Sequence, residues 1–220
     1  MEHDFRIVQS RPEMAEALAG IQRACFPTIS EGEIITAAQY AAHVKIFPQG
    51  QNAIIDRDGA PVACSTDMRC TMDFDHYQHT YLGVSGNNWL STHNPEGDWL
   101  YGVDIGVHPD YQGRGLSKLL YKARQDLARR LNLRGHILGG MIKGYGAIKD
   151  TMTPAQYIDK LNAGEIFDPT VSVQMRRGYK IEGILEDYVD DPSCANKAAF
   201  LVWRNPDYRE QRAPVKTAHK

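Results

Sequence analysis

The sequence predicts an α/β fold with an α+β mixed sheet, in which a central mixed β-sheet is flanked by helices. Segments with strand and helix periodicity are interleaved along the chain, in the order β, α, α, β, β, β, α, β, α, β, β. The chain has 220 residues, of which 42% are hydrophobic and 24% charged, a composition that supports a packed core. No repeat or low-complexity tract interrupts this order. We therefore expect a single domain over residues 1–220.

The N-terminal part of the chain predicts a strand, two helices and a β-hairpin. Ser10 and Pro12 are start signals for the first helix, whose apolar residues recur at helical spacing. Asp58 and Gly59 mark the turn of the hairpin. The predicted elements are strand 5–8, helix 11–26, helix 33–47, and hairpin strands 52–56 and 62–72.

A long polar excursion separates the hairpin from the next strand. Residues 73–98 contain several glycine and asparagine residues, and they exceed the usual length of a structureless connection, so we expect a functional or packing role. A strand over 99–107 follows. After it, residues 115–131 predict an amphipathic helix with leucine residues along one face.

The C-terminal part predicts alternating short elements. Thr153 and Pro154 are an N-cap and a first helical residue. The expected elements are strand 136–142, a helix from 153, a short helix over 171–177, and strands 179–185 and 197–203, followed by a tail at about 209–220.

The charge balance and the cysteine pattern limit the classes of partner and compartment. Twenty-five basic and 27 acidic residues leave a net charge of −2, which gives no general attraction to nucleic acid or to an anionic membrane. No apolar stretch approaches the roughly 20 residues that span a bilayer, and we expect no signal peptide. Without a zinc-type spacing, Cys25, Cys64, Cys70 and Cys194 predict buried, reduced thiols in the cytoplasm.

The most informative segment leads from a strand directly into a helix through two glycines. Gly113 and Gly115 allow a tight turn and a close approach of the backbone to a ligand, and the free N–H groups of a helix start favour phosphate oxygens. The segment therefore predicts an anion cradle; the alternative is a tight turn with no ligand. The Walker spacing is absent, and Lys118 stands where a dinucleotide fingerprint needs a third glycine.

The segment Gln112-Gly113-Arg114-Gly115-Leu116-Ser117 resembles the Gln/Arg-x-x-Gly-x-Gly/Ala signature of the GNAT superfamily of N-acetyltransferases, with Ser117 in the last small-residue position. The resemblance implies the GNAT acyl-CoA N-acyltransferase fold. It also implies that this loop holds the pyrophosphate of acetyl-CoA and that the preceding strand binds the pantetheine arm through its backbone. The implied cofactor-binding residues are Ile105, Gly106, Val107, Gln112, Gly113, Arg114, Gly115, Leu116, Ser117 and Lys118.

Other blocks extend the resemblance over about residues 5–208. Residues 175–179, Met-Arg-Arg-Gly-Tyr, resemble the helix-end Tyr-x-Lys-x-Gly-Phe segment of the superfamily. The chain is most similar to the GNAT domains that some bacteria fuse to carbon–nitrogen hydrolases, through residues 46–51, 92–99, 101–107, 132–135 and 202–206.

The implied reaction needs an unprotonated amine and a proton for the departing thiolate. In many GNAT enzymes a tyrosine protonates the thiolate, and the matching residue here is Gln174, whose amide is no general acid. Asp104 on the central strand is the candidate base, or else a structural aspartate. Tyr188 and Tyr145 are alternative sources of a phenol; we take Asp104 and Tyr188 as the catalytic candidates. Tyr101 is expected to be a core aromatic.

Polar residues of the excursion suggest two further roles. Trp89, His93 and Asp98 are candidates to line an acceptor pocket, with a self-packed loop as the equal alternative. The run Asp73, Asp75, His76 and His79 has the composition of a transition-metal site, but no spacing fixes a geometry, and we expect no metal.

The resemblance thus implies a cytoplasmic acyltransferase, with acetyl-CoA as co-substrate, that transfers acetyl directly to the amine of a small molecule or peptide. One alternative is a non-catalytic acyl-CoA-binding or regulatory module, which Gln174 suggests. Another is a domain that acts with a separate amidohydrolase. Neither nucleic acid nor membrane is an expected partner. The sequence leaves three properties undetermined: the acceptor, the acyl-chain preference, and whether the protein forms a homodimer.

Overall fold

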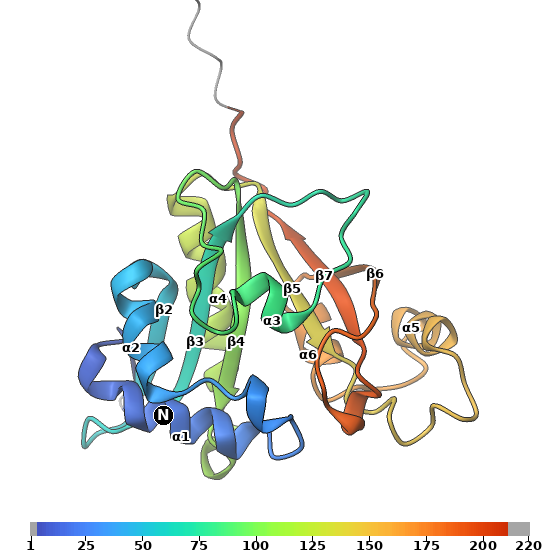
Figure 1. Ribbon diagram of the computed structural model, residues 1–220, viewed down its shortest axis with the longest axis horizontal. Helices are drawn as coiled ribbons and strands as arrows, with labels where there is room; N and C mark the ends of the chain where they lie inside the picture. Colours follow the sequence, from blue (N-terminus) through green and yellow to red (C-terminus); the bar gives the residue numbers. More distant parts are fainter. Residues whose placement is uncertain (1–3, 211–220) are drawn as a thin grey trace, which may run out of the picture.

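The computed structural model describes residues 4–210, which form a seven-stranded sheet with helices on both faces (Figure 1). The strand order is β1-β2-β3-β4-β5-β7-β6, and all neighbouring strands are antiparallel except β4 and β5. The expected mixed sheet is therefore confirmed. The strands are β1 (Arg6–Gln9), β2 (Gln51–Ile55), β3 (Pro61–Cys70), β4 (Trp99–Val107), β5 (Gly135–Met141), β6 (Lys180–Leu185) and β7 (Ala198–Arg204).

The helices divide between the two faces because side chains alternate along the strands. Ala53 of β2 packs in one apolar cluster with α1 and α2, whereas the adjacent Ile54 packs with Leu116 and Leu120 of α4. Figure 1 accordingly shows α1 and α2 in front of the sheet and α4 behind it. The helices are α1 (Ala15–Cys25), α2 (Ala37–Ile46), α3 (Tyr81–Ser85), α4 (Leu116–Arg130), α5 (Pro154–Ala163) and α6 (Val171–Met175).

The N-terminal capping residues and Pro12 explain where three of the helices begin. Thr153 accepts a hydrogen bond from the backbone of Gln156 in a capping box, so the predicted Thr153–Pro154 start is confirmed. The first helix begins later than expected, because Pro12 opens a 3-10 turn and α1 starts at Ala15. The second begins only after Thr36, its capping-box residue.

The excursion over 73–98 is more ordered than its composition suggested. It contains α3, which Thr80 caps and which ends at Gly86 in the left-handed conformation. The N–H of Tyr81 donates to the carbonyl of Tyr188, 2.6 Å away, so the excursion is tied to the loop between β6 and β7. Most of the expected C-terminal tail, residues 211–220, lies outside the described residues.

The parallel strands β4 and β5 separate after three paired residues. Their register joins Leu100, Tyr101 and Gly102 to His136, Ile137 and Leu138, while β4 continues to Val107 and β5 to Met141. On the other side of β4, Thr66 pairs with Asp104 and Asp67 with Gly102, so Val103 is the extra residue of a β-bulge. The sheet therefore opens at its centre.

A buried polar chain holds the sheet together beside this opening. Arg124 of α4 donates to the carbonyls of Thr66 and Asp104 at the bulge, and its Nε lies 3.0 Å from Asp67 Oδ1. His136 Nε2 lies 2.9 Å from the same Asp67 oxygen. The other ring nitrogen of His136 meets the Tyr179 hydroxyl at 2.9 Å. Three strands, α4 and the start of β6 are thus joined.

Burial and neighbouring polar groups determine the protonation states of Arg124 and His136 in this hydrogen-bond network. Burial is the largest single influence on Arg124 and lowers its pKa, but Asp67, Tyr121, Tyr179 and Asp104 together outweigh burial, so the Arg124 pKa is raised. Burial lowers the pKa of His136 despite its bond to Asp67, so a neutral ring donates from Nε2 and accepts the Tyr179 proton on Nδ1. Within residues 4–210, no helix is both long and apolar enough to cross a bilayer.

Replacing Arg124 with methionine is expected to lower the free energy of unfolding by about 3–5 kcal/mol, because Asp67 keeps a buried charge without its cation. Urea unfolding at pH 7 measures this loss. Arg129→Met on the same helix is the matched control: Arg129 pairs with Asp126 and Asp207 at the surface, where ion pairs contribute about 0–1 kcal/mol. Equal losses in the two variants would contradict a special role for the buried pair.

Candidate functional site

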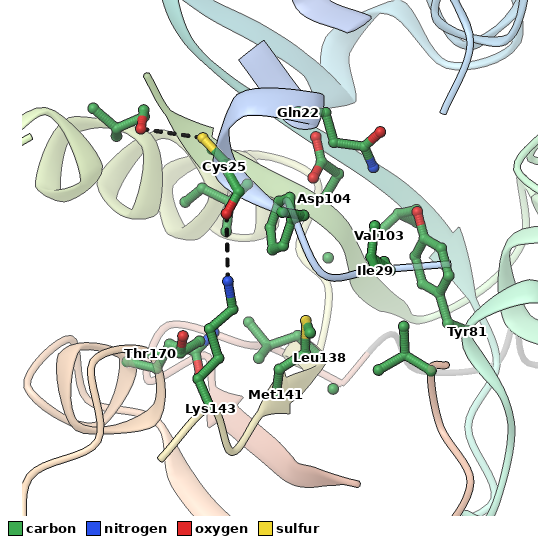
Figure 2. Close-up of a pocket in the computed structure, with 18 of the residues that line it drawn as sticks. Gln22, Cys25, Ile29, Tyr81, Val103, Asp104, Leu138, Met141, Lys143 and Thr170 are labelled. Carbon is green, nitrogen blue, oxygen red and sulfur yellow. Dashed lines mark hydrogen bonds between the residues drawn. The ribbon is translucent and has the colours of Figure 1, made fainter. Parts of the chain in front are cut away.

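The opening between β4 and β5 contains a cavity of about 200 Å³ (Figure 2). One wall comes from the β4 residues 102–107 and the other from β5. The end of α1, the loop after β6, Tyr81 of α3 and Gln174 of α6 also contribute to its lining. Its lining is mainly apolar, with the side chains of Phe26, Ile29, Val103, Leu138, Met141 and Val189.

A second hollow of about 400 Å³ continues from the first towards the glycine loop. Both are lined by Ile105, Val107, Gln112, Lys143 and Thr170, so the two form one cleft. The outer part adds the residues at the start of α4, namely Gly113, Gly115, Leu116 and Ser117. The cleft therefore runs from a helix N-terminus into the centre of the sheet.

Backbone conformation, not packing, requires the two glycines of the loop. Gly113 and Gly115 have φ angles of +75° and +80°, while a Cβ at either position would meet no atom within 4 Å. Gly115 is the N-cap of α4, whose 15 residues leave the first N–H groups without partners in the helix. These groups form the end of the cleft that suits an anion.

The polar side chains of the glycine loop mainly donate hydrogen bonds to nearby backbone carbonyls. Gln112 Nε2 donates to the carbonyl of Val107 at 3.1 Å, and Arg114 donates to the carbonyl of Asp110 at 3.3 Å. Leu116 is buried in the core, so only its backbone faces the loop. Lys118 is exposed.

The backbone of β4 offers hydrogen bonds to the cleft. His108 N–H donates to Val62 of β3, so the alternation of an antiparallel ladder turns the N–H and C=O groups of Val107 and Ile105 away from β3. The carbonyl of Val107 is already taken by Gln112 and by the thiol of Cys25, at 3.1 Å each. The N–H and C=O groups of Ile105 and the N–H of Val107 are thus the ones offered to an extended ligand.

Asp104 lines the cavity and is only 6% exposed. Its Oδ2 accepts a hydrogen bond from Tyr40 at 2.7 Å and the weaker bond of the Cys64 thiol at 3.8 Å. Burial raises the pKa of Asp104, although the Tyr40 bond and the positive charge of Arg124 oppose the rise. The carboxyl therefore titrates closer to neutrality than an exposed aspartate does.

Cys25 and Lys143 meet at the boundary between the two hollows. Figure 2 shows Lys143 reaching from beyond β5 to the carbonyl of Cys25, 3.4 Å away. Its ammonium also lies 4.6 Å from the ring centre of Phe26. Burial raises the pKa of Cys25 to about 12, so it stays a thiol. All four cysteines are free, as expected, but Cys25 lines the cavity and is not fully buried.

Tyr188 also lines the cavity, and it does not stand alone. Its hydroxyl lies 3.1 Å from that of Tyr101, which in turn lies 2.7 Å from His79 Nε2. Burial raises the pKa of Tyr188 to about 12. Tyr101 is a core aromatic as expected, but its hydroxyl connects the cavity to the excursion. Tyr145 is buried and lines neither hollow of the cleft.

Three residues that line the cavity have a buried polar atom without a hydrogen-bond partner among the described residues: Gln174 Oε1, the Tyr81 hydroxyl and Arg124 Nε, of which the last still faces Asp67 Oδ1 at 3.0 Å as an ion pair. Such atoms are costly to leave unpaired in a dry interior, which favours a ligand or water beside them. Tyr81 comes from α3, so the excursion does contribute to the cavity.

The other excursion residues lie elsewhere. His93 stacks on Phe47, Asp98 pairs with Arg134 at 2.7 Å, and Trp89 is about half exposed, so none of the three lines this cavity, which favours the alternative of a self-packed loop. His76 bonds Asp73 at the surface while His79 turns inward. Residues 4–210 contain no group of three side chains arranged to hold a metal.

Sequence reasoning missed Tyr40, Tyr81 and Lys143, and it considered His79 only as a metal ligand. Tyr40, Tyr81 and His79 are brought to the site by contacts between segments far apart in the chain, for which no local pattern exists. Lys143 was detectable, since it follows a strand next to the one that carries Asp104.

Comparison with known proteins agrees with the geometry. Residues 16–140 match the model of the Acetyltransferase (GNAT) family. The "Probable hydrolase YhcX" of Bacillus subtilis is 32% identical over 200 residues, which cover 90% of this chain but 38% of that protein. The "Uncharacterized N-acetyltransferase YkwB" of the same bacterium is 28% identical over 196 residues, covering 89% of this chain and 86% of the relative.

Among solved structures, the GphF GNAT-like decarboxylase in complex with isobutyryl-CoA has the same fold, with a TM-score of 0.71 at 17% identity. The match covers 90% of this chain and 98% of that one. The family model covers more than half of the chain, and the fold and the glycine loop agree with it: the chain belongs to the acetyltransferase (GNAT) family.

Proposed function

We propose that this protein is an N-acetyltransferase that transfers acetyl directly from acetyl-CoA to an amine, within a single cytoplasmic domain. The observation that carries the proposal is the continuous cleft, which begins at the α4 N-terminus and ends at Asp104 between the separated strands. The name of YkwB supports the reaction class, and the four free cysteines suit a reducing compartment.

The outer cleft would hold the CoA moiety. The backbone from Gly113 to Lys118, with Gln112 and Arg114 bracing the loop, would bind the pyrophosphate at the positive end of the helix dipole. The pantetheine arm would lie along Ile105, Gly106 and Val107. Ile105 offers it both backbone groups, which favours an extended arm at this point.

The inner cavity would hold the acyl group and the acceptor. Its apolar lining suits a short acyl chain, and the complex of the GphF decarboxylase with isobutyryl-CoA, a short acyl-CoA bound to the same fold, supports this assignment. Asp104 would attract the acceptor ammonium and, directly or through water, take one proton. Tyr188 would hand a proton to the departing thiolate, the role for which Gln174 lacks the chemistry.

A second candidate is a non-catalytic acyl-CoA-binding or regulatory module that acts with a separate amidohydrolase. Gln174 at the cavity and the name of YhcX, of which this chain spans only 38%, favour it. Both candidates bind CoA, but only the enzyme releases free thiol. A screen of amines, amino acids, polyamines and peptides with acetyl-CoA, followed by thiol detection, separates them.

Saturating CoA is expected to raise the Tm, because a ligand that binds only the folded state stabilises it by about 2.7 kcal/mol at 100 times its Kd. For a domain of this size the rise is roughly 5–10 °C. Gly115→Glu should abolish it, since the side chain strains the backbone and repels phosphate. Differential scanning fluorimetry measures both.

Gly164→Glu is the matched control for this experiment. Gly164 also has a positive φ of +71° and open space around its Cβ position, but it ends α5 and lines neither hollow. It should lower the Tm of the free protein and keep the CoA-induced rise. A full rise in Gly115→Glu would contradict the cradle assignment.

Asp104→Asn is expected to lower kcat by about 10²–10⁴-fold and to leave CoA affinity nearly unchanged, because it keeps the shape and removes the base. In the wild type, kcat/KM should fall as the pH drops through the raised pKa of Asp104, where the carboxylate becomes protonated. Fixed-time assays of the released CoA thiol across pH 4–8 measure both effects.

Asp98→Asn is the control, since Asp98 pairs with Arg134 away from the cavity. It should retain wild-type turnover. If Asp104→Asn instead unfolds more easily but turns over normally per folded molecule, Asp104 is structural.

A further inference from the structure

The three-membered hydrogen-bond chain from Tyr188 through Tyr101 to His79 has a definite direction. His79 Nδ1 lies 2.6 Å from the carbonyl of Tyr77, which can only accept, so Nδ1 carries a proton. Burial lowers the pKa of His79, and a neutral ring with its proton on Nδ1 accepts at Nε2. Tyr101 therefore donates to His79, and Tyr188 donates to Tyr101.

In this direction Tyr188, which lines the cavity, uses its own proton in the bond to Tyr101, so its oxygen keeps lone pairs and has no proton to offer a reactant. In its resting state Tyr188 can accept a proton from the cavity, whereas it cannot donate one. A proton that arrives on Tyr188 pushes the Tyr188 proton to Tyr101 and the Tyr101 proton to His79 Nε2. The chain is thus arranged to take up a proton and to pass it outward.

The ring of His79 is surrounded by aromatic side chains, so its uptake of a proton depends on the hydrogen bond to Tyr101. Its ring packs against Tyr101 of β4, Tyr188 of the β6–β7 loop and Phe200 of β7. Burial and the Tyr77 carbonyl set its pKa. The carboxylate of Glu33 acts on Tyr188 and not on His79. His79 is also the partly exposed end of the chain.

The proposed reaction moves two protons from the acceptor. An ammonium loses one proton before its nitrogen attacks the thioester carbon, and the nitrogen loses a second when the amide forms. The thiolate that leaves as the carbon–sulfur bond breaks gains one proton. One proton is therefore released to solvent in each turnover, and the other must be held until the thiolate departs.

We propose that His79 is a positioning residue that stores this second proton, receiving it from the acceptor through Tyr188 and Tyr101 and returning it along the same path to the thiolate. The proposal rests on the proposed function, in which Asp104 takes the first proton. It assigns a role to the excursion that differs from acceptor recognition.

The relay explains how tyrosines with raised pKa values take part. Neither Tyr188 nor Tyr101 has to ionise, because each gives up its own proton as it receives another. On return, the protonated ring donates from Nε2, the two hydroxyls reverse, and the Tyr188 proton points into the cavity. The residue that stores the proton is thus outside the cavity, away from the nucleophile.

Two variants that keep the ring packing test the relay: Tyr101→Phe and His79→Phe. Each is expected to lower kcat about 10²-fold, the usual contribution of one proton-transfer group, without changing the KM for acetyl-CoA or the CoA affinity. Because the two residues act in series, the double variant should be no slower than either single one. Tyr145→Phe removes a hydroxyl from a buried tyrosine outside the cleft and should leave kcat unchanged.

The pH dependence supplies a readout that packing alone does not move. In the wild type, kcat should fall as the pH drops through the His79 pKa, below 6.5, because a protonated ring can store no further proton. The midpoint should match the His79 titration seen by imidazole NMR. That limb should vanish in Tyr101→Phe, and only the limb of Asp104 should remain.

Three outcomes overturn the relay. An unchanged kcat in Tyr101→Phe does so while the proposed function stands, as does a double variant whose loss is the product of the two single losses. A wild-type protein that transfers acetyl to none of the amines in the screen overturns the proposed function and the relay with it.

Discussion

The ion pair of Arg124 and Asp67 is the constraint on which the centre of the molecule depends. A β-bulge at Val103 and the early separation of β4 from β5 interrupt the regular pairing of strands in the interior, where unpaired backbone groups are costly. Arg124 donates to the carbonyls of Thr66 and Asp104 at the bulge, and Asp67 compensates its charge. Gly102 makes room, since a Cβ there would lie 2.7 Å from the His136 ring.

The ion pair stabilises the opening between β4 and β5, and this opening exposes reactive groups to the cavity. Where two parallel strands stop pairing, their free edges and the side chains between them face a cavity instead of each other. Asp104 and Ile105 owe their position to that geometry, and so does Tyr188, whose ring fits only because position 139 is a glycine. The fold therefore places a carboxyl, a phenol and free backbone groups within one narrow space.

The sequence predicts the order of strands and helices, the mixed sheet and the glycine loop well, because periodicity and turn residues are local signals. It does not predict where β4 leaves β5, since this depends on a register set by Arg124 from another segment. Within the excursion, composition suggested His93, Asp98 and Trp89 for the cavity, but stacking on Phe47 and pairing with Arg134 hold the first two elsewhere. His79 and Tyr81 reach the site through long-range contacts that no local pattern encodes.

The hydrogen bond between the Tyr81 N–H and the Tyr188 carbonyl links two loops that are over a hundred residues apart in the chain. One loop belongs to the excursion and the other carries the cavity phenol. An insertion or deletion in either loop would shift both walls together, so under the proposed function and relay a change that suits a new acceptor would also act on proton handling. Relatives that differ in the length of the excursion should therefore differ in pH optimum as well as in acceptor, and such lengths offer a way to sort them into groups of shared chemistry.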